Sequence, residues 1–432
     1  MKKLLKMLLI ATMIISIMLP ATATYAASGG NDYPVVLCHG NGGWGRNEFD
    51  VRGYYWGGSF DLETSLNNDG YEVYSAAVGP FSSNWDRACE LYAYILGGTV
   101  DYGKAHSDKF DHDRYGRTYP GLYPQWGEVE QGEINKIHLL GHSQGGQTTR
   151  LMVQLLEEGM QSEIEAVLGS SPTQEQIDAA VESGRLSKLF TGTCNDWVAS
   201  VSTFATPHDG TTLADSVNLV GGDVLGLFVA QLGGITGVTN NTKYNLDLKL
   251  DQWSLQQKPG ELYSLYFLRV MGSSMWKTTK DFSNYDLSTK GAAEMNAWVK
   301  DQPNVYYFSY SCQATKKALL GYNQLPDTRY MNPLFYGPTM IMGAYLNPTT
   351  GIGTSWLPND GIVNTISEDG PSLGRSFGNI VAYNGTPQIG KWNNLGVLTR
   401  TDHEDILGRS TSNEMIDVKD FYSNHFDMLK GL

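Results

Sequence analysis

The chain has 432 residues, of which 41% are hydrophobic and 18% are charged, and its formal net charge is −14. This composition excludes an intrinsically disordered chain, which has few apolar side chains and many charges. The negative charge argues against a nucleic-acid partner, because binding phosphates requires a basic face. No internal repeat or low-complexity linker divides the chain, and nothing in it indicates a stable protein partner. We therefore expect a single globular domain over residues 28–432.

The first 27 residues have the pattern of a secretory signal peptide. Three lysines within the first six residues precede an apolar stretch, Leu8 to Pro20, that is too short to span a bilayer. Small residues follow, and we expect cleavage near Ala26 or Ala27. No later run of roughly 18 apolar residues could span a membrane. The sequence thus predicts a secreted, extracellular protein. Export permits disulfides, but the spacing of the four cysteines reveals no pairing.

Strand patterns alternate with helix patterns along the rest of the chain. Apolar runs bounded by glycine predict strands, and amphipathic stretches with capping residues predict helices. We expect strands at 34–38, 71–78, 134–140, 198–204, 305–311 and 379–383, and helices at 60–68, 84–96, 144–158 and 417–429. This alternation favours an α/β fold with a mostly parallel sheet. Two insertions interrupt it: residues 102–126, which look irregular, and the apolar, glycine-punctuated residues 213–238.

A Gly-x-Ser-x-Gly motif at Gly141, Ser143 and Gly145 stands between a predicted strand and a predicted helix. In a nucleophile elbow the serine occupies a strained turn that lifts its hydroxyl above the sheet, and small neighbours are needed there. The pentapeptide also occurs by chance, but here it has the expected strand-turn-helix context. We predict that Ser143 is a catalytic nucleophile.

A serine nucleophile needs a base, and the base needs an acid that orients it. In α/β-hydrolases the chain order is serine, acid, histidine. Of the three histidines after Ser143, His208 precedes any plausible acid, and His425 lies in the terminal helix pattern. His403 lies in a polar segment before that helix and is the predicted base.

The residues themselves leave the identity of the acid open. Asp360 lies in a turn-like Asn-Asp-Gly sequence before an apolar run, which is also the ordinary pattern of a simple turn. Spacing alone leaves three competitors, which are Asp327, Asp369 and Asp402.

Two backbone amides are expected to form an oxyanion hole. In this fold one comes from the residue after the nucleophile, here Gln144. The other comes from the loop after an early strand, and the glycine-rich segment around Asn41 suits that role. The alternative is a glycine-rich turn that serves only to reverse the chain.

The sequence as a whole resembles the zinc-containing thermoalkalophilic lipases of Gram-positive bacteria. The matching stretches run in family order and are VVLCHGNGGWG, YWGG, VGPFSSNWDRACE, GGTVDYGKAH, YGRTYPGL, GHSQGGQTTR, ATPHDGTTL, KLDQW, NDGIVNTIS and TDHEDI. They extend from about Asp32 to Asp405 and so cover nearly all of the chain after the leader. The resemblance implies an α/β-hydrolase fold with a helical lid at about 213–240. It also implies a triad of Ser143, Asp360 and His403.

The resemblance further implies a structural zinc site with part of its ligands in an insertion at about 85–126. The matching positions are Asp86, His106, His112 and Asp281. Two imidazoles and two carboxylates can complete a closed tetrahedral shell. Without the resemblance these ligands could not be chosen, because several other aspartates crowd the same loop.

A calcium site is implied at the positions of Gly321 and Asp405. The family's Asp-Pro pair is replaced here by Ser410 and Thr411, so one carboxylate is missing. Because calcium prefers several charged oxygens, we expect this site to be weakened or lost.

The resulting hypothesis is a secreted triacylglycerol lipase or carboxylesterase that acts on lipid or ester substrates, at a lipid–water interface if the lid opens there. An esterase or polyester hydrolase with an open cleft is the nearest alternative, and a serine peptidase fits less well. A catalytically inactive binding protein should lack a member of the triad, and none is missing here.

Overall fold

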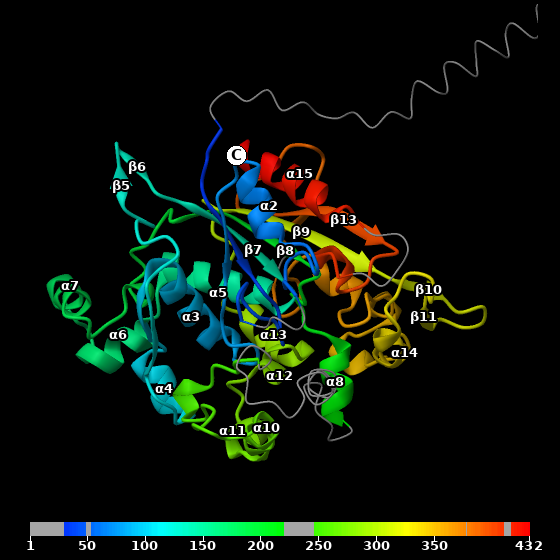
Figure 1. The fold of residues 1–432 in the computed structure, drawn as a ribbon, viewed down its shortest axis with the longest axis horizontal. Coiled ribbons are helices and arrows are strands. Elements are labelled where there is room, and N and C mark those ends of the chain that lie inside the picture. The colour runs from blue at the N-terminus through cyan, green and yellow to red at the C-terminus, as the bar shows by residue number, and fades with distance from the viewer. Residues whose placement is uncertain (1–29, 49–52, 220–245, 377, 410–415) are drawn as a thin grey trace, which may run out of the picture.

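The computed structural model describes residues 30–48, 53–219, 246–376, 378–409 and 416–432. Its centre is a seven-stranded sheet with the order β12-β13-β9-β8-β7-β1-β2, in which every neighbouring pair is parallel (Figure 1). The strands are β1 (Val35–Cys38), β2 (Val73–Ala76), β7 (Ile137–His142), β8 (Val198–Phe204), β9 (Tyr306–Gln313), β12 (Ile380–Ala382) and β13 (Trp392–Thr399). The predicted α/β fold with a mostly parallel sheet is confirmed.

Helices cover both faces of this sheet (Figure 1). Val35 and Leu37 of β1 pack into one apolar cluster together with helices α2 (Leu62–Asn68) and α15 (Val418–Lys430). Val36 and Cys38 point to the opposite face and pack with helices α3 (Asn84–Leu96) and α5 (Gln144–Glu158). Successive side chains of a strand face opposite sides. A strand covered on both sides is therefore apolar throughout, as β1 is.

The segment 102–126 was predicted to be irregular, and this prediction is wrong. It contains helix α4 (Lys104–Phe110) and strand β4 (Tyr115–Tyr119), which pairs with β3 (Gly98–Asp101). The start of α4 is fixed from outside the segment, because the carboxylate of Glu163 accepts hydrogen bonds from the backbone N–H groups of Ala105 and His106. A cap that comes from a distant residue leaves no local pattern to recognise.

Smaller elements surround the sheet. The further helices are α6 (Gln161–Leu168), α7 (Gln174–Glu182), α8 (Thr212–Leu219), α10 (Tyr263–Gly272), α11 (Ser274–Thr278), α12 (Ser283–Asp286), α13 (Thr289–Asn296) and α14 (Tyr336–Met342). Two hairpins are formed by β5 (Val129–Glu130) with β6 (Glu133–Ile134), and by β10 (Thr315–Lys317) with β11 (Gln324–Pro326). Single-turn 3-10 helices occur at Lys188–Phe190, Asp251–Trp253, Pro333–Phe335, Pro348–Thr350, Thr354–Trp356, Thr365–Glu368 and Asp405–Leu407.

Two predicted segments fall wholly or partly outside the described residues. The signal peptide at 1–27 is one of them, and the lid at 213–240 is described only as far as residue 219. Within the described part of the chain, every helix is too short or too polar to cross a bilayer. All four cysteines are described, and each is buried and unpaired.

Candidate active site and metal-binding group

Ser143 lies in the tight turn between β7 and α5, where its φ of 54° and ψ of −132° place it in a conformation that side-chain-bearing residues rarely adopt. The chain on either side is packed closely. A Cβ atom on Gly141 would lie 2.4 Å from the backbone of Gly145, and one on Gly145 would lie 2.2 Å from the carbonyl oxygen of Cys38. Only glycine fits both positions, which accounts for the Gly-x-Ser-x-Gly pattern.

A buried carboxylate and an imidazole are paired at the same end of the sheet. Oδ2 of Asp360 lies 2.5 Å from Nδ1 of His403, and Asp360 is fully buried. The other carboxylate oxygen of Asp360 accepts hydrogen bonds from the backbone N–H groups of Ile362 at 2.8 Å and Val363 at 2.7 Å. The backbone N–H of His403 also donates to the carbonyl of Asp360 at 3.0 Å. These contacts hold the imidazole in one orientation.

The pair also sets the charge of the ring. Burial alone would lower the pKa of His403, but the adjacent Asp360 carboxylate outweighs burial, and the pKa lies above its ordinary value. The imidazole therefore takes up a proton more readily than a histidine in water, as a general base must.

The other acids that sequence spacing left open have different partners. Asp327 lies 3.3 Å from Lys316 and from Arg329 in ion pairs on the surface, and Asp369 accepts from the hydroxyl of Ser311. Asp402 accepts from the backbone N–H of Asn332. Among the described residues, Asp360 is the carboxylate bonded to the His403 ring.

The two other late histidines are packed in the interior. Nε2 of His208 lies 2.9 Å from the hydroxyl of Thr203, and its ring packs against Trp392. Nε2 of His425 lies 2.7 Å from the hydroxyl of Ser202. Burial lowers the pKa of both rings, to about 3 in His425, so both are neutral structural groups.

Ser143 and His403 line one cavity. Its remaining wall is mostly apolar and is formed by Asn41, Gly42, Trp44, Tyr55, His142, Pro207, Thr211, Leu213, Ala214, Asn284, Leu287, Ile362, Val363, Glu404, Leu407 and Arg409. A concave apolar site with a few convergent polar groups suits a substrate that combines a hydrophobic chain with one reactive polar bond.

The two predicted oxyanion residues lie next to each other. The side-chain amide of Asn41 donates to the side-chain oxygen of Gln144 at 3.3 Å, and Gln144 is held in turn by the carbonyl of Ser82 at 3.0 Å. Within the described part of the chain, the backbone N–H groups of Asn41 and Gln144 donate to no other protein group. Both amides remain available to a ligand beside Ser143.

Sequence reasoning missed two residues that support this site. The hydroxyl of Tyr55 accepts a hydrogen bond from the backbone N–H of Gly40 at 2.8 Å. Glu368 is fully buried, and its carboxylate accepts from the backbone N–H of Cys312. Burial, and then the charge of Asp360, raise the pKa of Glu368 well above its ordinary value. Neither residue lies in a catalytic motif. Tyr55 belongs to the YWGG stretch of the resemblance, which assigned it no role.

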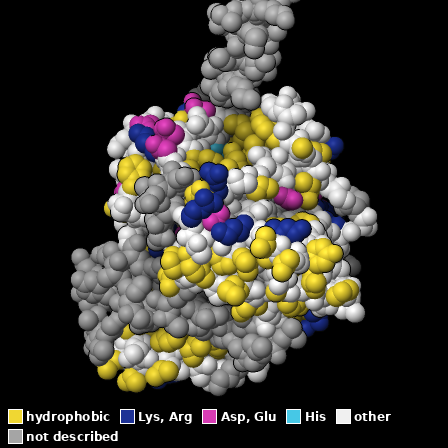
Figure 2. Space-filling view, turned by 90° about the vertical axis from the view of Figure 1, so that its right-hand side faces the viewer, with side chains coloured by type: hydrophobic (Ala, Val, Ile, Leu, Met, Phe, Trp, Pro, Cys, Tyr) yellow, Lys and Arg dark blue, Asp and Glu magenta, His cyan; other side chains and the backbone are white. Residues whose placement is uncertain are grey.

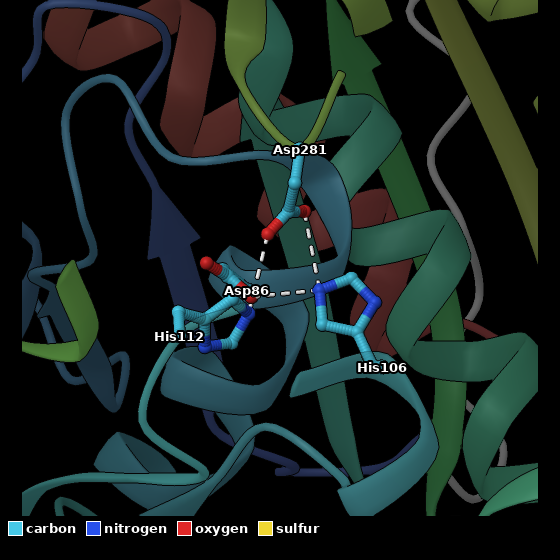
Figure 3. A group of neighbouring side chains, drawn as sticks. All are labelled: Asp86, His106, His112 and Asp281. Atoms are coloured by element: carbon cyan, nitrogen blue, oxygen red, sulfur yellow. Dashed lines mark ion pairs between the residues drawn. The ribbon is translucent and has the colours of Figure 1, made fainter. Parts of the chain in front are cut away.

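Four side chains from three separate segments meet beside α3 and α4 (Figure 3). They are Asp86, His106, His112 and Asp281, and one nitrogen or oxygen atom of each lies within 4.8 Å of those of the others. Nε2 of His106 lies 3.3 Å from Oδ1 of Asp86 and 3.1 Å from Oδ1 of Asp281. Nε2 of His112 lies 3.3 Å from Oδ2 of Asp281. The residues that the resemblance pointed to are thus together in space.

These atoms have the arrangement of a metal-ligand set. Ligands about 2.0–2.1 Å from a tetrahedral zinc ion lie about 3.3 Å from one another. The three contacts given above match this separation, and all four atoms lie within 4.8 Å of one another. Oδ1 of Asp86, Nε2 of both histidines and Oδ2 of Asp281 are buried, and apart from their contacts with one another none has a hydrogen-bond partner. Buried polar atoms without partners are costly, so four that converge on one point indicate a place for a cation.

A second layer of contacts orients these ligands. Nδ1 of His112 lies 2.8 Å from the carbonyl of Asp113, so this nitrogen carries the hydrogen and leaves Nε2 as the lone-pair donor. The side-chain amide of Gln252 donates to Oδ2 of Asp86 at 2.8 Å. The ring of Trp85 stacks on His106 with centroids 4.9 Å apart. Burial alone would lower the pKa of His106, but without a metal ion the two carboxylates raise it to about 9, so a cation that binds here would displace a proton from this ring.

The positions implied for calcium are arranged differently. Gly321 lies at the exposed tip of the β10–β11 hairpin, with no atom within 4 Å of the place where a Cβ would be. Asp405 is buried, and its Oδ2 accepts from the backbone N–H of Asp402 at 2.8 Å. Residues 410 and 411 lie outside the described part of the chain. Whether calcium binds stays a prediction.

A serine on a strained strand-to-helix turn, followed along the chain by a buried aspartate–histidine pair at the same end of a parallel sheet, places this molecule among the α/β-hydrolases. A family model described as "Lipase-like, C-terminal domain" matches residues 31–430. The chain belongs to that family.

Individual relatives agree with this assignment. The chain is 37% identical over 407 residues to Lipase 1 of Staphylococcus aureus (strain MRSA252), a match that covers 92% of this chain and 54% of the relative. It thus spans about half the length of the curated relatives it matches. Among solved structures, it is similar to EstA from Clostridium botulinum, with 46% identity, a TM-score of 0.81 and coverage of 96% of this chain and 90% of the other. It is also similar to lipase 1 from Pelosinus fermentans, with 49% identity, a TM-score of 0.79 and coverage of 93% and 99%.

Proposed function

We propose that the protein is a carboxylic-ester hydrolase of the triacylglycerol lipase or carboxylesterase type. The observation that supports this most directly is the contact between Asp360 and His403 in the cavity that also contains Ser143. Two of the relatives are named as lipases, which points to the same chemistry.

The proposed reaction begins when the Ser143 hydroxyl attacks the ester carbonyl while His403 takes its proton. The Asp360 carboxylate orients the imidazolium that forms and stabilises its charge. The backbone amides of Asn41 and Gln144 donate to the oxyanion of the tetrahedral intermediate. His403 then protonates the leaving alcohol, and water releases the acid from the acyl-enzyme by the same steps.

Zinc is the proposed occupant of the group formed by Asp86, His106, His112 and Asp281. Two imidazoles and two carboxylates suit zinc, and four protein ligands complete its tetrahedral shell. Such an ion would join α3, the α4 segment and the segment before α12 without taking part in ester cleavage. The separations near 3.3 Å and the unpartnered buried atoms support this proposal.

We further propose that the enzyme is secreted and works at a lipid–water interface, as the sequence favours. Its support is the leader pattern at 1–27 and the apolar stretch at 213–238. An esterase or polyester hydrolase with an open cleft would use the same triad, so the physical state of the substrate separates the alternatives.

The test is a series of p-nitrophenyl esters of increasing chain length, followed by emulsified triglycerides, assayed with the wild type and with Ser143→Ala. Loss of a triad member typically lowers kcat by about 10⁴-fold or more. We expect Ser143→Ala to be folded and inactive. If it retains more than about a tenth of wild-type ester hydrolysis, the assignment of the nucleophile is wrong.

A further inference from the structure

An exposed hydrophobic surface lies on the side of the molecule that carries β10, β11 and α14. At the tip of the hairpin, Leu319 is 98% exposed, Leu320 is 86% exposed and Tyr322 is 69% exposed. Figure 2 looks onto this side and shows hydrophobic side chains gathered in a broad band, with Lys and Arg side chains along its upper margin. Apolar side chains exposed together are unusual in a soluble protein and mark a site of interaction.

The surface continues from the hairpin onto α14. We define the apolar surface by its eight exposed members, which are Leu319, Leu320, Tyr322, Leu325, Leu334, Met340, Ile341 and Leu346. The hairpin and the helix are joined, because the backbone N–H of Gln324 donates to the carbonyl of Gly343 at 2.8 Å. The two parts therefore form one unit.

The buried side of this unit touches the wall of the active-site cavity. Phe335 and Met342 pack in one cluster with Leu213, Ile362 and Val363. The last three residues also line the cavity that contains Ser143. The unit that carries the apolar surface therefore packs against residues that line the cavity.

The charge of the unit differs from that of the whole chain. Residues 315–346 contain three basic side chains, Lys316, Lys317 and Arg329, and one acidic side chain, Asp327. Their net charge is +2, whereas the chain as a whole carries −14. Lys316 and Lys317 precede the exposed leucines with one residue, Ala318, between them. Basic residues beside apolar ones are the pattern of a segment that binds an anionic lipid surface.

We propose that the apolar surface docks the enzyme on the surface of an aggregated, negatively charged lipid. Leu319 and Leu320 enter the acyl region, Tyr322 lies at the head-group level, and Lys317 contacts anionic head groups. Lys316 joins it by exchanging its half-exposed ion pair with Asp327 for one with a head group. This inference rests on the proposed ester hydrolase function. Hydrolysis of lipid esters releases fatty-acid carboxylates, so the docked surface becomes more negative as the reaction proceeds.

The test is flotation of the full-length protein with vesicles of ether-linked phosphatidylcholine, with and without ether-linked phosphatidylglycerol. Ether lipids offer no ester bond, so binding is measured without hydrolysis. Leu319→Asp/Leu320→Asp should lower vesicle binding by about tenfold or more, because burying a leucine side chain contributes roughly that factor. Lys316→Gln/Lys317→Gln should weaken binding only to vesicles that contain phosphatidylglycerol, and only at low salt.

The matched control is Val129→Asp, which places the same charge at a 69% exposed position on the β5–β6 hairpin, at the other end of the molecule in Figure 1. It should bind vesicles like the wild type. All variants should hydrolyse p-nitrophenyl butyrate in solution at the wild-type rate, since none touches the cavity. A wild type that hydrolyses no soluble ester would defeat the proposed function, while vesicle binding would still be measured.

Three results would overturn the docking proposal. The wild type could fail to float with either vesicle, or the double leucine variant could float as well as the wild type. In the third result, the wild type does not bind vesicles but self-associates in sedimentation velocity experiments, whereas the double leucine variant is monomeric. A second copy of the chain would then be the occupant of this surface.

Discussion

The hydroxyl of Tyr55 lies 2.7 Å from Nδ1 of His142, the residue that precedes Ser143. Nε2 of His142 faces the carbonyl oxygen of His403 at 2.9 Å, so that nitrogen carries the hydrogen and Nδ1 accepts. Tyr55 therefore donates to His142 and accepts from Gly40. Burial lowers the pKa of His142 well below its ordinary value, so the ring stays neutral and the direction of every hydrogen bond is fixed. This series of hydrogen bonds connects the loop that contains Asn41 to the backbone of His403.

Tyr55→Phe should weaken both stability and catalysis. The variant leaves the Gly40 N–H and Nδ1 of His142 buried without partners, which costs roughly 1–3 kcal/mol per group. We expect a lower melting temperature and a fall in kcat with little change in KM. The reason is that the hydrogen-bond series positions the Asn41 loop at one end and His403 at the other, and both are proposed to act in the transition state. Tyr54→Phe is the control. Wild-type kcat in Tyr55→Phe would show that this network is only structural.

Asp360→Asn should change the pH dependence of activity. The Asp360 charge raises the pKa of His403, so the acidic limb of kcat/KM in the wild type should lie above the ordinary imidazole value of about 6.5. In the variant this limb should move to lower pH, and kcat should fall by about 10⁴-fold. An unchanged acidic limb would indicate that another group titrates.

The same pair predicts a dependence of stability on pH. The pKa of His403 is raised in the folded state, so the pairing stabilises the fold fully below the unfolded value of about 6.5. The contribution is lost as pH rises through the folded pKa. The difference in unfolding free energy between the wild type and Asp360→Asn should therefore be largest in acid and shrink at alkaline pH. Chemical denaturation across this range measures it.

The parts of the fold that the sequence predicts well are those with two covered faces. The run Val35–Cys38 is apolar throughout because helices cover both sides of β1. Strand β13 was not predicted, because it contains Asn393, Asn394 and Gly396, and its pairing with β9 shifts register within that stretch. Such an irregularity is imposed by neighbouring strands and has no sequence periodicity.

The candidate site was predictable to different degrees. Ser143 has a local motif, whereas Asp360 and the metal ligands required the family resemblance. Asp86 and Asp281 are far apart in sequence, and nearby aspartates compete with them. The structure gives two of those competitors other partners: Asp101 binds Arg114 at 2.7 Å, and Asp108 binds Lys104 at 2.7 Å. Only tertiary contacts distinguish a ligand from such an ion pair.

Activity should depend on an interface if the apolar stretch at 213–238 acts as a lid. We expect the rate per enzyme to rise as tributyrin passes its solubility limit, because the cavity would then open onto an aggregated substrate. A smooth saturation curve through that limit would favour an esterase with an open cleft. Most of this stretch lies outside the described residues, so kinetics are the direct measurement.

Added calcium should stabilise the protein little. Ser410 and Thr411 replace the carboxylate and proline of the resembled family, and Gly321 lies at an exposed hairpin tip. Calcium binds well where several charged oxygens converge. Thermal unfolding with calcium or with a chelator selective for calcium should give nearly the same melting temperature. A large rise with calcium would require other ligands, with Asp402 and Glu404 the first to examine.

Removing zinc should destabilise the fold without removing the catalytic groups. An ion that binds only the folded state stabilises it by about 4 kcal/mol when free ion is at ~1,000 times Kd. Metal analysis of protein prepared without chelator should give one zinc per chain. Chelation should lower the melting temperature and increase hydrogen exchange in α4, because His106 lies on that helix and His112 follows it.

His106→Ala and His112→Ala should each reproduce the effect of chelation, and chelator should then add little to either variant. Asp108→Ala is the matched control, because Asp108 lies on the same helix and its carboxylate is bonded to Lys104 at the surface. It should retain zinc and respond to chelator like the wild type. Any loss of ester hydrolysis in the histidine variants should follow their loss of folded protein, since the metal group has no residue in the cavity of Ser143. Zinc-free protein, with unchanged melting temperatures in both histidine variants, would reject the site.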